Sequence, residues 1–220
     1  MNNLFELTPY YKEPSEKYII ITCAIFMREK NYKSHLVYYN GLLNIVNNFK
    51  QYYKENYYLR IYYDNSIEST NHPLPENNEY IKKYWLPFIS KLKTIDYVQL
   101  VKVNCKLFKK NEVYHYGSFT VFGRYIPMFI NNPNIDHMFI IDVDDTLQYG
   151  YRLYKKLLPY YNEYNPELVY ITIGIRLNEP RHLKYPFHIA GKSFISLTSF
   201  PEEIFINFLM GLHKKQYNKN

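Results

Sequence analysis

The chain has 220 residues, of which 47% are apolar and 21% charged, and its formal net charge is +7. This length allows one domain with a substantial core. The lysines are spread along the chain without a block of like charges, which argues against a nucleic-acid-binding surface. The 27 tyrosines, with abundant Asn, Lys and Ile, are typical of an AT-rich genome such as that of a large DNA virus or a parasite.

The cysteines and the N-terminal segment exclude two further classes of protein. Cys23 and Cys105 lie in apolar, strand-like surroundings, which predicts reduced thiols rather than a disulfide framework. Residues 1–17 are too polar for a signal peptide, and every apolar run is too short for a membrane span. We therefore expect a cytoplasmic protein, in the host cytoplasm or the virion if viral. It would have an N-terminal arm (1–17), one domain (18–213) and a polar tail (214–220).

Strands and helices alternate through the first part of the chain. Residues 18–26 form a continuous apolar run rich in β-branched side chains, which predicts a strand buried on both faces. Apolar residues then recur at helical spacing over residues 34–56, with Ser34 as the N-cap. Residues 58–63 predict a second strand, which ends at the turn-forming residues 64–66. Together these elements make a β-α-β unit.

The same alternation continues toward the C-terminus. The pattern predicts strands at 98–103, 138–141 and 168–174, and helices at 79–92, 120–129, 151–161 and 201–212. Pro87 is expected to kink or divide the first of these helices. Such alternation predicts an α/β fold, a three-layer α/β/α sandwich around a mostly parallel sheet.

An acidic motif, Asp142-Val143-Asp144 followed by Asp145, comes directly after one predicted strand. In an open α/β sheet, ligands bind beyond the carboxyl ends of the strands. Alternate residues of an extended segment point the same way, so Asp142 and Asp144 are within reach of one cation. Carboxylate oxygens suit Mg²⁺ or Mn²⁺, and such an ion would bind the diphosphate of a nucleotide sugar.

One resemblance of this motif is to the haloacid-dehalogenase-like phosphatases. Asp142-Val-Asp-Asp-Thr-Leu147 is similar to their nucleophile motif, which implies Asp142 as the nucleophile. In that superfamily the nucleophilic Asp ends the first strand of the core, and a Ser or Thr, a Lys and an acidic pair follow. Thr172 and Lys192 match two of these roles, whereas Glu202-Glu203 begins a helix instead of following a strand. The phosphatase is therefore an alternative.

A broader resemblance covers residues 18–195 and is to glycosyltransferases of the GT-A fold, family 8 (glycogenin-like) in particular. In these enzymes an Asp-x-Asp motif follows a β-α-β-α-β nucleotide-binding region. An Arg precedes it in a pattern that Gly123-Arg124-Tyr-Ile-Pro127 matches, which implies that Arg124 contacts the phosphates or sugar of the donor. A late His-x-x-Gly-Lys segment matches His188-Ile-Ala-Gly-Lys192. The match implies His188 as a third metal ligand and Lys192 as a phosphate contact, although other GT-A enzymes place a donor or acceptor loop there.

Three further residues are candidates for donor contacts. Asp64 ends the second strand, where GT-A enzymes often hold an acidic residue against the uracil or ribose; the alternative is a simple turn. Thr22, near the end of the first strand, is a candidate for contact with the base, or an ordinary strand residue. Asp145 is the candidate catalytic residue beside the donor sugar. Scattered histidines such as His35 and His137 are expected at the surface or in the core.

The predicted function is metal-dependent transfer of a hexosyl or N-acetylhexosaminyl group from a nucleotide-diphosphate donor, a UDP-sugar, to a glycan or protein acceptor. Mn²⁺ or Mg²⁺ would be held by Asp142, Asp144 and His188. The alternatives are the phosphatase and a non-catalytic module that binds a nucleotide sugar. No nucleic-acid partner and no membrane span are expected.

Overall fold

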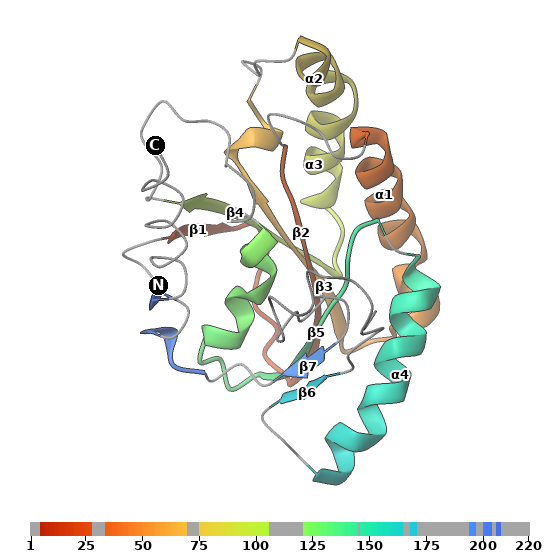
Figure 1. Cartoon of the computed structure of the whole chain (residues 1–220), viewed down its shortest axis with the longest axis vertical. Helices are drawn as coiled ribbons and strands as arrows, with labels where there is room; N and C mark the ends of the chain where they lie inside the picture. The colour runs from red at the N-terminus through yellow and green to blue at the C-terminus, as the bar shows by residue number, and fades with distance from the viewer. Residues whose placement is uncertain are drawn as a thin grey trace, which may run out of the picture.

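The computed structural model describes residues 5–27, 34–69, 75–105, 121–144, 146–164, 168–170, 194–196, 200–203 and 206–207. The strands in this part of the chain are β1 (Phe5–Pro9), β2 (Tyr18–Ile25), β3 (Tyr57–Asp64), β4 (Val98–Cys105), β5 (Ile135–Ile140), β6 (Leu168–Tyr170) and β7 (Phe194–Ser196). The helices are α1 (His35–Tyr52), α2 (Pro75–Tyr80), α3 (Leu86–Leu92) and α4 (Leu147–Tyr164). Shorter turns of helix are η1 (Asn65–Ile67), the π-helical η2 (Ile81–Trp85) and the 3₁₀-helical η3 (Val121–Phe129) (Figure 1).

The strands form one sheet in the order β1-β4-β3-β2-β5-β7-β6. β2 pairs in parallel with β3 and with β5, and β3 pairs in parallel with β4. β1 runs antiparallel to β4, and β7 runs antiparallel to β5 and β6. The predicted α/β class with a mostly parallel sheet is therefore confirmed. Because the chain moves from β2 to β3 and β4 and then returns to place β5 on the other side of β2, the strand order reverses between β2 and β5.

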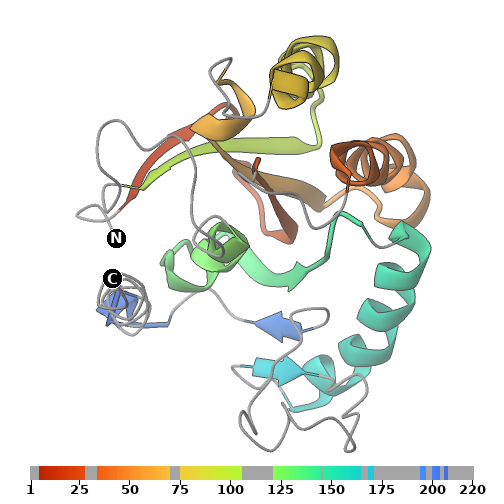
Figure 2. The same ribbon diagram turned by 45° about the horizontal axis from the view of Figure 1, so that its top comes forward.

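The central strand β2 is buried on both faces because the sheet is covered on both sides. Alternate residues such as Ile21 and Cys23 pack against α1, α2–α3 and α4, in a core that includes Ile45 and Phe49 of α1. The opposite face of the sheet is covered by η3. Its Ile126 is fully buried against that side of the sheet. Figure 2 shows the helices α1 to α4 curving around one face and η3, in green, lying against the other.

Several elements differ from the predicted pattern. The N-terminal arm contributes β1, an edge strand whose Phe5 is buried, and β7 adds an antiparallel strand that the sequence pattern did not indicate. The helix expected at 79–92 is continuous from α2 to α3, and Pro87 neither divides nor ends it but follows directly after a π-helical turn. The segment at 121–129 is 3₁₀ rather than α-helical and contains Pro127. Most of the predicted helix at 201–212 and of the strand at 168–174 lies outside the described residues.

Within the described part of the chain, each helix is too short or too polar to cross a bilayer.

A buried arginine ties the N-terminal arm to the sheet. Arg60 of β3 is 1% exposed, and its Nε donates to Oε1 of Gln99 at 2.8 Å. Its Nη2 donates to the hydroxyl of Tyr18 at 3.1 Å and to Oε1 of Glu13 at 3.3 Å. The guanidinium also lies over the ring of Tyr11, 5.0 Å from its centroid. The hydrogen-bond acceptors for Arg60 are therefore side chains of the fold itself, namely Gln99, Tyr18 and Glu13.

A second network occupies the start of β5. The Nδ1 of His137 lies 2.6 Å from the Asp136 carboxylate, and its Nε2 lies 2.9 Å from the hydroxyl of Tyr154 in α4. That hydroxyl lies 3.1 Å from the hydroxyl of Tyr57. The hydrogen bond with His137 lowers the pKa of Asp136 below its ordinary value. His137 is 2% exposed, so of the two locations expected for the scattered histidines, this one lies in the core.

Candidate functional site

The acidic motif leaves the sheet at the point where the strand order reverses. The backbone N–H of Ile141 donates to the carbonyl of Thr22 at 3.0 Å, so pairing with β2 continues one residue beyond β5. Val143 is buried, whereas Asp142 and Asp144 on either side of it are partly exposed. Residues 143–144 form a turn, and the shared orientation of the two carboxylates stays a prediction.

Arg124 reaches the motif from η3 and forms an ion pair with Asp142. The side chains of Arg124 and Asp142 are only 12% and 20% exposed. Burial alone would lower the pKa of Arg124, but the neighbouring Asp142 carboxylate and Tyr125 raise it overall, so the guanidinium stays charged. Its Nε is buried and has no hydrogen-bond partner among the described residues. Arg124, which was predicted as a contact for the donor, therefore lies beside the acidic motif.

Thr22 supports this arginine from below. Its side chain is fully buried, and its hydroxyl donates to the backbone carbonyl of Arg124 at 3.2 Å. This bond fixes η3 over β2. The Thr22 hydroxyl thus has a hydrogen-bond partner within the fold, and its side chain is not exposed to a ligand. A contact between Thr22 and a nucleotide base would have to come from its backbone.

Asp64 lies at the same edge of the sheet, at the end of β3, and is 1% exposed. Its carboxylate accepts hydrogen bonds from the backbone N–H of Ser66, at 3.0 Å, and from the Ser66 hydroxyl. The Ser66 hydroxyl in turn accepts from the backbone N–H of Met27 at 2.8 Å. These contacts join the ends of β2 and β3 and favour the turn alternative for Asp64 over a contact with uracil or ribose.

The backbone of α1 packs directly on the acidic motif at Gly41. A Cβ atom added to Gly41 would lie 1.9 Å from the carbonyl oxygen of Val143 and 3.4 Å from the Cα of Asp144. No side chain fits in this space, so glycine allows the close approach. Gly41 was not among the predicted site residues, although a glycine inside an otherwise regular helical pattern is a signal of such a contact.

The remaining predicted residues cannot be placed. Asp145, His188 and Lys192 lie outside the described residues, as does Thr172 of the phosphatase alternative. Within the described ranges, no group of three or more His, Cys, Asp or Glu side chains is arranged to hold a metal. Asp142 and Asp144 still suit a divalent cation, because Mg²⁺ is usually held by one or two carboxylates together with the phosphates of its substrate.

Cys23, the residue after Thr22 in β2, is fully buried in the core on the α1 side of the sheet. Burial raises the pKa of its thiol to about 12, an effect that Arg124 opposes and Asp142 reinforces. The thiol is therefore protonated at neutral pH, and it acts as a small apolar side chain and not as a nucleophile.

Comparisons of the chain with protein-family models, with curated proteins and with solved structures give no match.

Proposed function

We propose that the protein is a metal-dependent glycosyltransferase that uses a nucleotide-diphosphate sugar, a UDP-sugar in the first instance. The observation that carries the proposal is the pairing of Arg124 with Asp142, next to Asp144, at the reversal of strand order. Crevices at such reversals are the usual ligand sites of open α/β sheets. A charged guanidinium beside carboxylates offers complementary contacts for a phosphate and for the cation that accompanies it.

The order of elements favours this proposal over the phosphatase. A phosphatase of the haloacid-dehalogenase type carries its nucleophile at the end of the first core strand. Here β2, β3 and β4, with α1 and α2–α3 between them, all precede β5 and Asp142. This β-α-β-α-β region before an Asp-x-Asp motif is the arrangement that the resemblance to GT-A glycosyltransferases implies.

Each described side chain has a distinct role in the proposed reaction. Asp142 and Asp144 would hold Mn²⁺ or Mg²⁺, and the ion when bound would neutralise charge on the diphosphate. Arg124 orients the phosphates and stabilises the charge that develops on them as the sugar departs. Thr22 and Gly41 hold Arg124 and the acidic motif in place from opposite sides.

The reaction exchanges one bond at the anomeric carbon for another. The bond from C1 to the β-phosphate oxygen breaks, and its electron pair leaves with the nucleoside diphosphate. An acceptor hydroxyl oxygen forms the new bond to C1, and its proton passes to the departing phosphate or to water.

A thermal-shift screen of UDP, GDP and ADP with and without Mn²⁺ tests the proposal. A nucleotide present at about 100 times its Kd should stabilise the folded protein by about 2.7 kcal/mol. We expect stabilisation by UDP that requires Mn²⁺, and release of UDP from a UDP-sugar when a glycan acceptor is added. Turnover of p-nitrophenyl phosphate with no response to any nucleotide would support the phosphatase instead. Stabilisation without UDP release from any UDP-sugar would indicate the non-catalytic binding module.

A further inference from the structure

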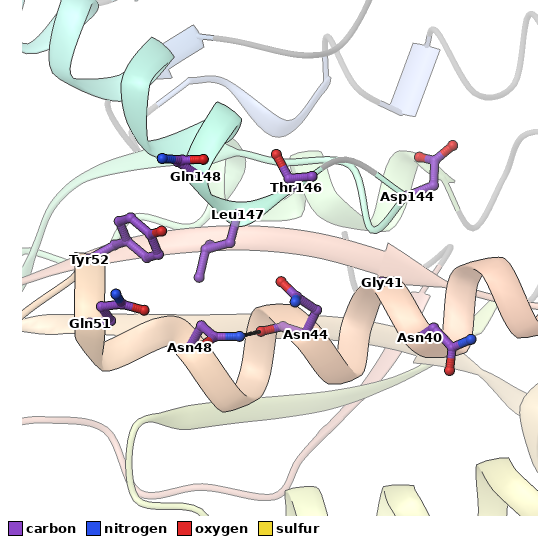
Figure 3. A pocket seen from close by; sticks show the side chains of 10 residues that line it. All are labelled: Asn40, Gly41, Asn44, Asn48, Gln51, Tyr52, Asp144, Thr146, Leu147 and Gln148. Atoms are coloured by element: carbon purple, nitrogen blue, oxygen red, sulfur yellow. Dashed lines mark hydrogen bonds between the residues drawn. The ribbon is translucent and has the colours of Figure 1, made fainter.

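A polar groove runs between α1 and the start of α4 and ends at the acidic motif. It has a volume of about 510 Å³. One wall is formed by α1 and the other by the beginning of α4, with the buried Leu147 pointing between them (Figure 3). Asp144 lies at one end of the groove, with its carboxylate turned away from α1 (Figure 3). The lining residues are Asn40, Gly41, Asn44, Asn48, Gln51, Tyr52, Asp144, Thr146, Leu147 and Gln148.

The chemistry of this lining is that of a site for neutral, hydroxyl-rich ligands. Five of the ten described lining residues are Asn or Gln, and Asp144 is the one that carries a charge. An amide group offers both a donor and an acceptor, which matches a sugar hydroxyl or a pair of adjacent hydroxyls. Tyr52 adds an aromatic ring with a polar tip, which provides an apolar surface for a sugar ring beside a hydrogen-bonding group. A nucleotide or a nucleic acid would require cationic groups, and the described lining supplies none.

The amides of α1 follow the helix turn by turn. Asn44 and Asn48 are spaced by four residues, and Gln51 follows three residues later, so these positions share one face, whereas the side chain of Asn40 points away from α4 (Figure 3). From Asn44 to Gln51 this face extends roughly 10 Å at 1.5 Å per residue, long enough for more than one sugar ring.

The groove is joined to the proposed donor site through the backbone. Gly41 lines the groove, and α1 packs at this residue against the carbonyl of Val143. Asp144 belongs both to the groove and to the acidic motif. A chain of sugars lying along α1 would therefore direct its end toward the carboxylates that, in the proposed function, hold the donor.

We infer that this groove binds a neutral oligosaccharide and is the acceptor subsite of the enzyme; its role as an acceptor subsite rests on the proposed function. The acceptor class is then a glycan with uncharged hexose or N-acetylhexosamine units, and the terminal unit supplies the hydroxyl that attacks C1 of the donor. The bonds that break and form are those of the proposed transfer from the donor to an acceptor hydroxyl, and no additional reactant is needed.

The inference is tested with saturation-transfer NMR and calorimetry, with maltotetraose, cellotetraose and chitotetraose as probes. We expect at least one tetrasaccharide to bind the wild type, and the double variant Asn44→Ala/Gln51→Ala to bind it at least tenfold more weakly. Asn47→Ala is the matched control, because Asn47 is exposed on α1 but does not line the groove, and it should bind as the wild type does. Affinity for UDP with Mn²⁺ should be the same in all three proteins.

The possible results separate this inference from the proposed function. Tetrasaccharide binding that is lost in the double variant, in a protein that shows no affinity for UDP and Mn²⁺, would leave the glycan groove standing and remove the transferase. Binding that is equal in the double variant and the wild type would overturn the groove assignment, as would an equal loss in Asn47→Ala. Failure of all three probes to bind a protein that does bind UDP with Mn²⁺ would overturn the groove alone.

Discussion

Two buried arginines lie on the same face of the sheet and differ in what surrounds them. Arg60 donates to Gln99, Tyr18 and Glu13 and lies over the ring of Tyr11, so its guanidinium is bound by side chains of the fold. Arg124 has its ion pair with Asp142, but its buried Nε has no partner among the described residues. A largely buried donor without a partner is costly, and it is a candidate for contact with a ligand or an ordered water. We therefore expect Arg60 to act in the scaffold and Arg124 to be available to a ligand.

The largest expected effect is on stability, from replacing Arg60. Arg60→Met leaves the buried Oε1 of Gln99 without its donor and removes the hydrogen bonds from Arg60 to Tyr18 and to Glu13 of the arm. We expect a loss of about 3 kcal/mol in the free energy of unfolding, measured by urea denaturation. Arg60→Lys should recover only part of it, because an ammonium cannot form the same fork of bonds. If Arg60→Met has the same urea midpoint of unfolding as the wild type, the hydrogen bonds of Arg60 do not stabilise the fold.

The next effect concerns Gly41, which borders the acidic motif. Gly41→Ala places a methyl group against the carbonyl of Val143, so the motif or α1 must shift. The cost should be about 2 kcal/mol in stability, together with a loss of Mn²⁺-dependent UDP binding. Gly150→Ala in α4 is the matched control, because its added Cβ would lie 3.1 Å from a side-chain atom of Ile141 and no backbone lies in its way. Calorimetry on both variants checks this, and equal UDP affinity in the two would contradict the role of Gly41.

A smaller effect is expected from Arg124→Gln, and it should be on binding more than on folding. Loss of the guanidinium removes a contact for the phosphates, and we expect the Kd for UDP with Mn²⁺ to rise about tenfold, or about 1.4 kcal/mol. Stability should fall by about 1 kcal/mol, because the pair is only 12% and 20% exposed but the amide of Gln can still donate to Asp142. The opposite pattern, with stability lost and affinity kept, would make Arg124 a structural residue like Arg60.

The smallest effect is at Asp136, at the far end of β5 from the acidic motif. Its pKa is lowered in the folded protein by the hydrogen bond with His137. The stabilisation is therefore present above the ordinary Asp pKa, about 3.9, and is lost as the pH falls through the lower folded-state pKa. Asp136→Asn should cost less than about 1 kcal/mol at neutral pH, because the carboxylate is partly exposed. In urea unfolding as a function of pH, the free energies of unfolding of the wild type and the variant should converge in acid. UDP binding at neutral pH should be the same in both proteins. A difference in stability that persists in acid would assign the effect to something other than this charge.

The sequence predicted the elements whose hydrophobic pattern is long and regular. The apolar run of β2 and the helical spacing of α1 correspond to buried elements. Arg124 lies beside the acidic motif, and its contact with a donor stays a prediction. The short strands β1 and β7 were not predicted, because three to five residues carry too little pattern.

The rest of the candidate site depends on contacts between distant parts of the chain. Arg60 looks like a surface residue until Gln99 and the N-terminal arm close over it. The contact of Gly41 with Val143, and the groove beside it, exist only because α1 packs next to the start of α4. Local propensity contains no information on such packing.

The most direct test of the account is calorimetric titration of UDP, in the presence and absence of Mn²⁺, into the wild type and into Asp144→Asn. That substitution removes one charge from a partly exposed side chain and nearly keeps its size. We predict Mn²⁺-dependent binding of UDP by the wild type and at least a tenfold weaker affinity in the variant. Equal affinity of the two proteins for UDP with Mn²⁺ would contradict it.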